Sequence, residues 1–174
     1  MKDNQKYAKE MLDFIEKSPS CFHAVANVKR ILEEQGFTEL EESQDWTVEA
    51  GRGYYVTRND SSIIAFRLPG SDDTDGVTGR ENVDGFHMVA AHSDSPSFKI
   101  KESPESTVEN HYVRLNTEKY GGMILSTWLD RALSVAGRVA VKEKGHIVTK
   151  LVNVDKDLLV IPNVAIHMNR DMNR

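Results

Sequence analysis

The sequence predicts an α/β protein, and three observations lead to this prediction. Apolar residues recur at helical spacing through the first 35 residues, whereas from residue 54 onward they alternate or run in short β-rich stretches. Four apolar residues, 88–91, then lead into His92. Such a run is typical of a buried strand that delivers its last side chains to a sheet edge. We therefore expect helices packed on a sheet, followed by a β-rich region.

Two amphipathic helices are expected at the N-terminal end. The first spans residues 3–17 and ends at Ser18, because the residue before a proline is biased away from helical geometry. The second runs from about residue 22 to residue 35, and Gly36 supplies its stop. We interpret both helices as packing elements, and His23 at the start of the second one receives no ligand role.

Strands follow the helices. Residues 54–57 and 63–66 read as a hairpin across the Asn- and Asp-containing turn 58–61. Residues 69–85 are rich in Gly, Ser, Thr and acids and are interpreted as a surface loop, since they lack the spacing and terminal glutamate of a calcium-binding loop. Residues 97–101 alternate like a half-exposed strand.

A polar break over residues 102–110 is interpreted as a boundary between two subdomains. Beyond it the chain is predicted to be β-rich, with a hairpin turn at Gly145. The strands expected there are residues 112–115, 134–141, 146–152 and 158–160.

Composition narrows the function classes. The chain has 174 residues, 39% of them hydrophobic and 28% charged, which is typical of a globular protein that leans polar. A net charge of −5 without a basic stripe argues against nucleic-acid binding. No apolar run approaches the roughly 20 residues that span a bilayer, and no secretory signal is expected. The single cysteine, Cys21, is compatible with a reducing compartment, so we expect a cytoplasmic protein.

His92 and Asp94 form the candidate site. Residues two apart in an extended chain point to the same face, so both side chains can address one locus. A neutral imidazole is a common zinc ligand, and a carboxylate often fixes its tautomer. His-x-Asp is also frequent by chance, and a histidine that ends a strand is often a hydrogen-bonded structural residue. Catalytic zinc needs about three protein ligands, so the pair can only begin a metal site.

A resemblance to a known family covers much of the chain. Residues 91–96 resemble the Ala-His-Thr-Asp-Ser-Pro signature of the aspartyl aminopeptidase (M18 metallopeptidase) family, with Ser93 in place of threonine. Residues 18–25 resemble the family's Ser-Pro-Ser-Pro-Phe-His-Ala-Val, with Cys21 in place of the second proline. Further blocks are similar in the same order, at residues 57–59 with 62–66, 120–122, 126–131, 136–139 and 161–167.

The resemblance implies a metalloaminopeptidase in which two Zn²⁺ ions, or Co²⁺ or Mn²⁺, share a bridging aspartate and a bridging water. His92 matches the first metal ligand of the family, and Asp94 matches the carboxylate that orients it. His167 matches a histidine that the dimerisation domain carries into the partner subunit's active site. The metal ligand expected from the resemblance is thus His92, and the expected catalytic residues are Asp94 and His167.

The resemblance also implies the domain organisation. Residues 1–103 correspond to the N-terminal part of a zinc-peptidase α/β sandwich, and residues 104–174 to the first part of an inserted β-rich dimerisation domain. Asp130 lies in a block of the dimerisation domain, so we interpret it as structural rather than as the bridging aspartate. A peptide substrate and a homo-oligomer are expected, without nucleic acid or membrane.

The remaining ligands of the family, including its Glu-Glu pair, have no counterpart here. Glu33-Glu34 and Glu41-Glu42 both precede the candidate metal strand and cannot substitute. We therefore expect these 174 residues to be inactive by themselves. The alternative from another class is a non-catalytic assembly or binding module that retains the oligomerisation surface.

Overall fold

The computed structural model of the protein describes residues 2–70 and 85–170, which form two compact units. The first unit comprises Met1–Asp94 and Gly137–Leu151, and the second comprises Ser95–Ala136 and Val152–Arg174. Helices and sheets are both present, so the predicted α/β class is confirmed. No helix among the described residues is long and apolar enough to cross a membrane.

Both predicted helices belong to the first unit. Helix α1 spans Lys2–Glu16 and α2 spans Cys21–Glu34, each within a residue of its expected bounds. The hydroxyl of Ser20 caps α2 by accepting a hydrogen bond from the backbone N–H of His23 at 3.4 Å. At its other end Gly36 adopts a φ of 79°, which ends the helix as predicted.

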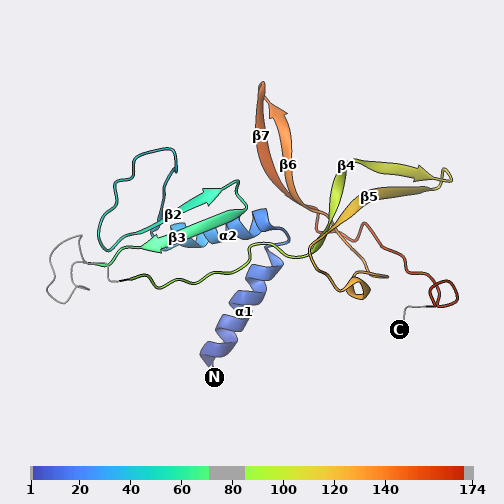
Figure 1. Ribbon diagram of the computed structural model, residues 1–174, viewed down its shortest axis with the longest axis horizontal. Coiled ribbons are helices and arrows are strands. Elements are labelled where there is room, and N and C mark those ends of the chain that lie inside the picture. The colour runs from blue at the N-terminus through green and yellow to red at the C-terminus, as the bar shows by residue number, and fades with distance from the viewer. Residues whose placement is uncertain (1, 71–84, 171–174) are drawn as a thin grey trace. The chain divides into compact units, whose positions relative to one another are not determined.

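A small sheet packs beside α2 (Figure 1). Strand β2 (Gly53–Arg58) pairs antiparallel with β3 (Ser62–Arg67) and parallel with the short β1 (Thr38–Glu39). The β2–β3 hairpin is the predicted one. The buried core of the described residues consists of Tyr54, Tyr55 and Val56 of β2 together with Val25 of α2.

A second hairpin contributes to the first unit. Strands β6 (Ala136–Glu143) and β7 (His146–Asn153) pair across Lys144 and Gly145, which adopt φ angles of 50° and 86°. Two consecutive positive φ angles are typical of a tight hairpin turn, and the predicted turn at Gly145 is thereby confirmed.

The second unit contains a long hairpin. Strand β4 (Ser97–Val108) pairs antiparallel with β5 (Tyr112–Tyr120), and the register shifts between Ile100 and Glu105. A 3₁₀ turn, η1 (Leu125–Thr127), follows β5. The ring of Trp128 packs edge-on against Phe98 with centroids 5.3 Å apart, and this contact anchors the turn on the start of β4.

Three local predictions were wrong. Residues 88–91 form no strand, and Val89 is fully exposed, because no neighbouring strand pairs with this segment among the described residues. The expected polar break at 102–110 instead continues β4 to Val108, since a two-stranded hairpin with both faces exposed tolerates polar residues. Residues 158–160 contribute only an isolated bridge, between Leu133 and Leu159. The predicted loop at 69–85 lies largely outside the described residues.

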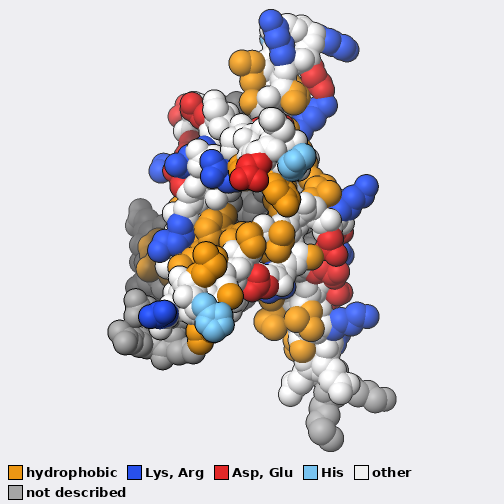
Figure 2. All heavy atoms as spheres, turned by 90° about the vertical axis from the view of Figure 1, so that its right-hand side faces the viewer, with side chains coloured by type: hydrophobic (Ala, Val, Ile, Leu, Met, Phe, Trp, Pro, Cys, Tyr) orange, Lys and Arg blue, Asp and Glu red, His pale blue; other side chains and the backbone are white. Residues whose placement is uncertain are grey.

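Many large apolar side chains are exposed. Orange apolar spheres lie among charged ones on the face shown in Figure 2. On α1 the exposed apolar residues are Tyr7, Met11, Leu12 and Ile15, and before the candidate site they are Phe86, Met88 and Val89. A monomeric protein rarely leaves so many uncovered, so these surfaces are suited to further burial.

Candidate functional site

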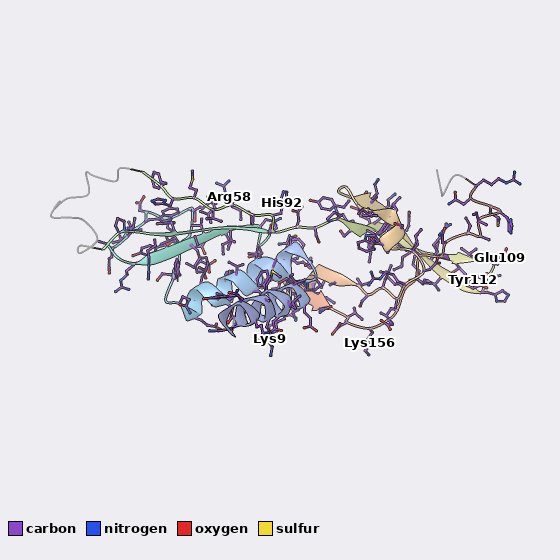
Figure 3. The ribbon with its side chains drawn as sticks, turned by 90° about the horizontal axis from the view of Figure 1, so that it is seen from below. Lys9, Arg58, His92, Glu109, Tyr112 and Lys156 are labelled. Carbon is purple, nitrogen blue, oxygen red and sulfur yellow. The ribbon has the colours of Figure 1, made fainter. Side chains whose placement is uncertain are left out.

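His92 and Asp94 lie close together, as their spacing predicts. His92 Nδ1 is 3.1 Å from Asp94 Oδ1 in an irregular segment that follows the β2–β3 hairpin along the chain (Figure 3). The imidazole is 93% exposed, and the carboxylate is 38% exposed. When the proton is on Nδ1, it is donated to Asp94, and the lone pair of Nε2 is left available. This is the arrangement of a metal-ligating histidine with its orienting carboxylate.

The donor set fits one zinc ligand but not a zinc site. Catalytic zinc is held by about three protein side chains. Within residues 2–70 and 85–170, no group of three or more His, Cys, Asp or Glu side chains could hold a metal ion. The described part of the chain therefore supplies His92 only as a single candidate ligand.

The sequence predicts no role for Ser93, which lies between the two site residues. Its side chain is half-buried, and its hydroxyl donates a hydrogen bond of 2.8 Å to the carbonyl oxygen of Ser61. Ser61 lies in the turn between β2 and β3. Side chains that alternate along an extended segment explain the division of roles, with His92 and Asp94 turned outward and Ser93 inward.

Asp130 has a structural environment. Its φ is 55°, and its backbone N–H donates to the carbonyl of Ile161 at 3.0 Å. The carboxylate accepts a hydrogen bond of 2.8 Å from the backbone N–H of Asn163. Asp130 thus joins two segments of the second unit, which agrees with its interpretation as a structural residue.

The other two histidines of interest differ in burial. His167 is exposed in a turn, where the N–H of Met168 donates to the carbonyl of Ala165 at 2.8 Å. His23 is half-buried, and its Nδ1 lies 2.8 Å from the hydroxyl of Ser20. Burial lowers the pKa of His23, and the contact of its ring with Ser20, the residue that caps α2, gives it a structural role.

Comparison with known proteins identifies the family. The sequence profile described as "Aminopeptidase I zinc metalloprotease (M18)" matches residues 14–174. The chain belongs to the M18 aminopeptidase family. The resemblance noted in the sequence is thereby confirmed, and the family's description as a zinc metalloprotease makes Zn²⁺ the metal to consider.

Relatives and solved structures agree with this assignment. A probable M18 family aminopeptidase 2 of Clostridium novyi is 50% identical over all of this chain, which spans 39% of that protein. The Ape4 structure from an Ape4–Nbr1 complex superposes with a TM-score of 0.82 at 40% identity, covering 95% of this chain and 30% of that one. The mApe1 dodecamer of S. cerevisiae gives 0.79 at 28% identity, covering 95% and 37%.

The chain thus spans about two fifths of the length of the curated relatives that it matches. The fold and the family are common to all of these proteins. The individual roles of His92, Asp94 and His167 stay predictions.

Proposed function

We propose that this chain is the N-terminal part of a zinc aminopeptidase that removes N-terminal residues from peptides. The observation that carries the proposal is the exposed His92–Asp94 pair, at 3.1 Å, in a chain whose family is one of zinc metalloproteases. His92 and Asp94 are only two residues apart, so the pair lies within one short segment of this chain.

Each residue of the pair has a distinct task. His92 would hold zinc through Nε2, and Asp94 would accept the Nδ1 proton, which fixes the tautomer and raises the basicity of the ligating nitrogen. When bound, zinc supplies Lewis-acid polarisation of the scissile carbonyl. Two ions per complete site are proposed, with the missing ligands contributed by the part of the relatives' length that this chain does not span.

Residues 1–103 and 104–174 are proposed to belong to a catalytic and a dimerisation domain, respectively. The mApe1 structure that resembles this chain is a dodecamer. The exposed apolar side chains of the second unit, among them Tyr112, Val113 and Ile166, support burial in a homo-oligomer. A peptide is the proposed substrate and the cytoplasm the proposed compartment, to which the single cysteine is suited.

His167 is proposed to act on substrate in a neighbouring subunit. Its exposure in a turn supports this role, because the side chain is available for an intersubunit contact. In the family-length protein, meaning this chain joined to the remaining length of its relatives, His167→Phe should lower turnover about 10-fold or more and leave zinc content unchanged. Assays of kcat with metal analysis check this, and a loss of zinc in the variant would contradict the assignment.

A second candidate function is a non-catalytic assembly module, favoured by the lack of a metal-holding cluster in the described residues. The two candidates differ in what the protein does without metal. A module would form stable oligomers in the presence of a chelator and would show no peptidase turnover in any context.

Aminopeptidase assays on two polypeptides test the proposal. The 174-residue chain should show no turnover of aminoacyl substrates and no stoichiometric zinc, because one histidine cannot hold a catalytic ion. The family-length protein should show both. Turnover by the 174 residues alone would contradict the proposed division of ligands, and an inactive family-length protein that assembles normally would favour the module.

A further inference from the structure

The turn between β2 and β3 is held in place by contacts from elsewhere in the first unit. Asn59 and Asp60 adopt φ angles of 52° and 51°, and the N–H of Ser61 donates to the carbonyl of Arg58 at 3.1 Å. Positive φ at two successive residues is costly for residues other than glycine, although Asn and Asp tolerate it best. Such a turn persists when its surroundings hold it.

Arg138 of β6 supplies much of that support. Its guanidinium donates to both the backbone carbonyl of Asn59 at 2.7 Å and the side-chain Oδ1 of the same residue at 2.9 Å. The carboxylate of Asp60 lies 3.7 Å away, and the ring of Phe22 is stacked 4.2 Å from the guanidinium carbon. The arginine side chain is only 21% exposed. A planar guanidinium that donates hydrogen bonds along one edge and stacks one face on an aromatic ring is held in a single orientation. Arg138 can therefore hold Asn59 in position.

The same turn receives the hydroxyl of Ser93. This 2.8 Å bond to Ser61 joins positions 32 residues apart and is adjacent in sequence to His92. The segment 85–96 contains no helix or strand, and its residues Met88 and Val89 are 88% and 100% exposed. An irregular segment with so little burial needs such a tether if the residues after it are to hold one geometry.

We propose that the β2–β3 turn is the platform that positions the candidate metal ligand, with Ser93 fastening the His92 segment to the turn and Arg138 fastening the turn to β6. Ser93 and Arg138 are positioning residues in this scheme and touch neither metal nor substrate. The inference rests on the proposed role of His92 as a ligand. Its consequence is that His92 is preorganised, which lessens the ordering that metal binding must impose.

Backbone order, measured by NMR on the 174-residue chain, and zinc affinity, measured on the family-length protein, test this proposal. The order parameters of residues 91–94 report the tether, and titration of the zinc-loaded family-length protein with a competing chelator reports the affinity for zinc. Ser93→Ala should bring the order parameters below about 0.6, the range of flexible backbone. It should also weaken zinc binding at His92 ~5-fold, as the loss of one ordinary hydrogen bond would.

The matched variants separate positioning from general stability. Ser93→Thr keeps a hydroxyl and should retain both the backbone order and the zinc affinity. Arg138→Gln should lower both quantities, as Ser93→Ala does. Ser95→Ala removes the hydroxyl of an exposed serine two residues further on and should change neither.

Three outcomes would overturn the inference: unchanged order in Ser93→Ala, failure of Ser93→Thr to retain it, or an unaffected His92 segment in Arg138→Gln. A wild-type family-length protein that binds no zinc would instead contradict the proposed function. The order parameters would still decide whether the tether exists.

Discussion

At the scale of single residues, Tyr55 shows how burial and hydrogen bonding combine. The ring is fully buried, and its hydroxyl donates a 2.6 Å hydrogen bond to Glu33. Burial, followed by that bond to Glu33, raises the pKa of Tyr55 well above its ordinary range. Tyr55 thus joins the sheet to α2 in its protonated form.

The raised pKa of Tyr55 predicts a pH dependence of folding. Since the folded protein keeps this proton more tightly than the unfolded chain, the stability it contributes is complete below pH 10 and falls as the pH rises above it. Tyr55→Phe should cost about 1 kcal/mol of unfolding free energy at pH 8. The difference in unfolding free energy between the wild type and the variant should be smaller at pH 11 than at pH 8 by roughly 1 kcal/mol. Urea unfolding at both pH values measures it, and a gap that widens would show that the sign is wrong.

The sequence predicted only those contacts of the site that join residues close together in the chain. His92 and Asp94 are two residues apart, so extended-chain geometry alone places them together, and the structure confirms their proximity. The bond from Ser93 to Ser61 and that from Arg138 to Asn59 span 32 and 79 residues. No periodicity or short motif carries such information, and both contacts were therefore missed.

At the scale of elements, β2 illustrates close packing. An added Cβ on Gly53 would lie 2.6 Å from the ring of Phe37, well inside van der Waals contact. The absence of a side chain at residue 53 therefore lets the segment after α2 pack over the start of β2. A glycine within a strand often marks such a close approach.

Gly53→Ala is expected to destabilise the protein by about 1–3 kcal/mol, because the Phe37 ring must move to admit the methyl group. Gly137→Ala, in β6, is the matched control. Nothing lies within 4 Å of its added Cβ, so its unfolding free energy should stay within about 1 kcal/mol of wild type. Thermal unfolding followed by circular dichroism compares them, and equal effects would exclude the steric explanation.

Elements formed by local patterns were predicted well, and those that depend on neighbours were not. Helices α1 and α2 and the β2–β3 hairpin follow from spacing and turn residues. The apolar run 88–91 has the composition of a buried strand, yet a buried strand requires partners on its edges, and the described residues provide none. The polar end of β4 forms a strand because β5 pairs with it, although its composition gives no such signal.

At the scale of the whole molecule, the comparison with relatives and the exposed apolar surface lead to the same expectation. A chain that spans about two fifths of its relatives' length exposes apolar side chains on α1, on residues 86–89 and on the second unit. We expect the remaining length of the family-length protein to cover part of this surface. The same remaining length would complete the coordination that His92 begins.

The most direct test of whether His92 is a metal ligand uses the His92→Ala variant of the family-length protein. Its zinc content and its peptidase turnover are measured. The variant should lose zinc and turnover together, while His146→Ala, which removes an exposed histidine of β7, should keep both. A His92→Ala protein that retains full zinc and full turnover would show that His92 is not a metal ligand.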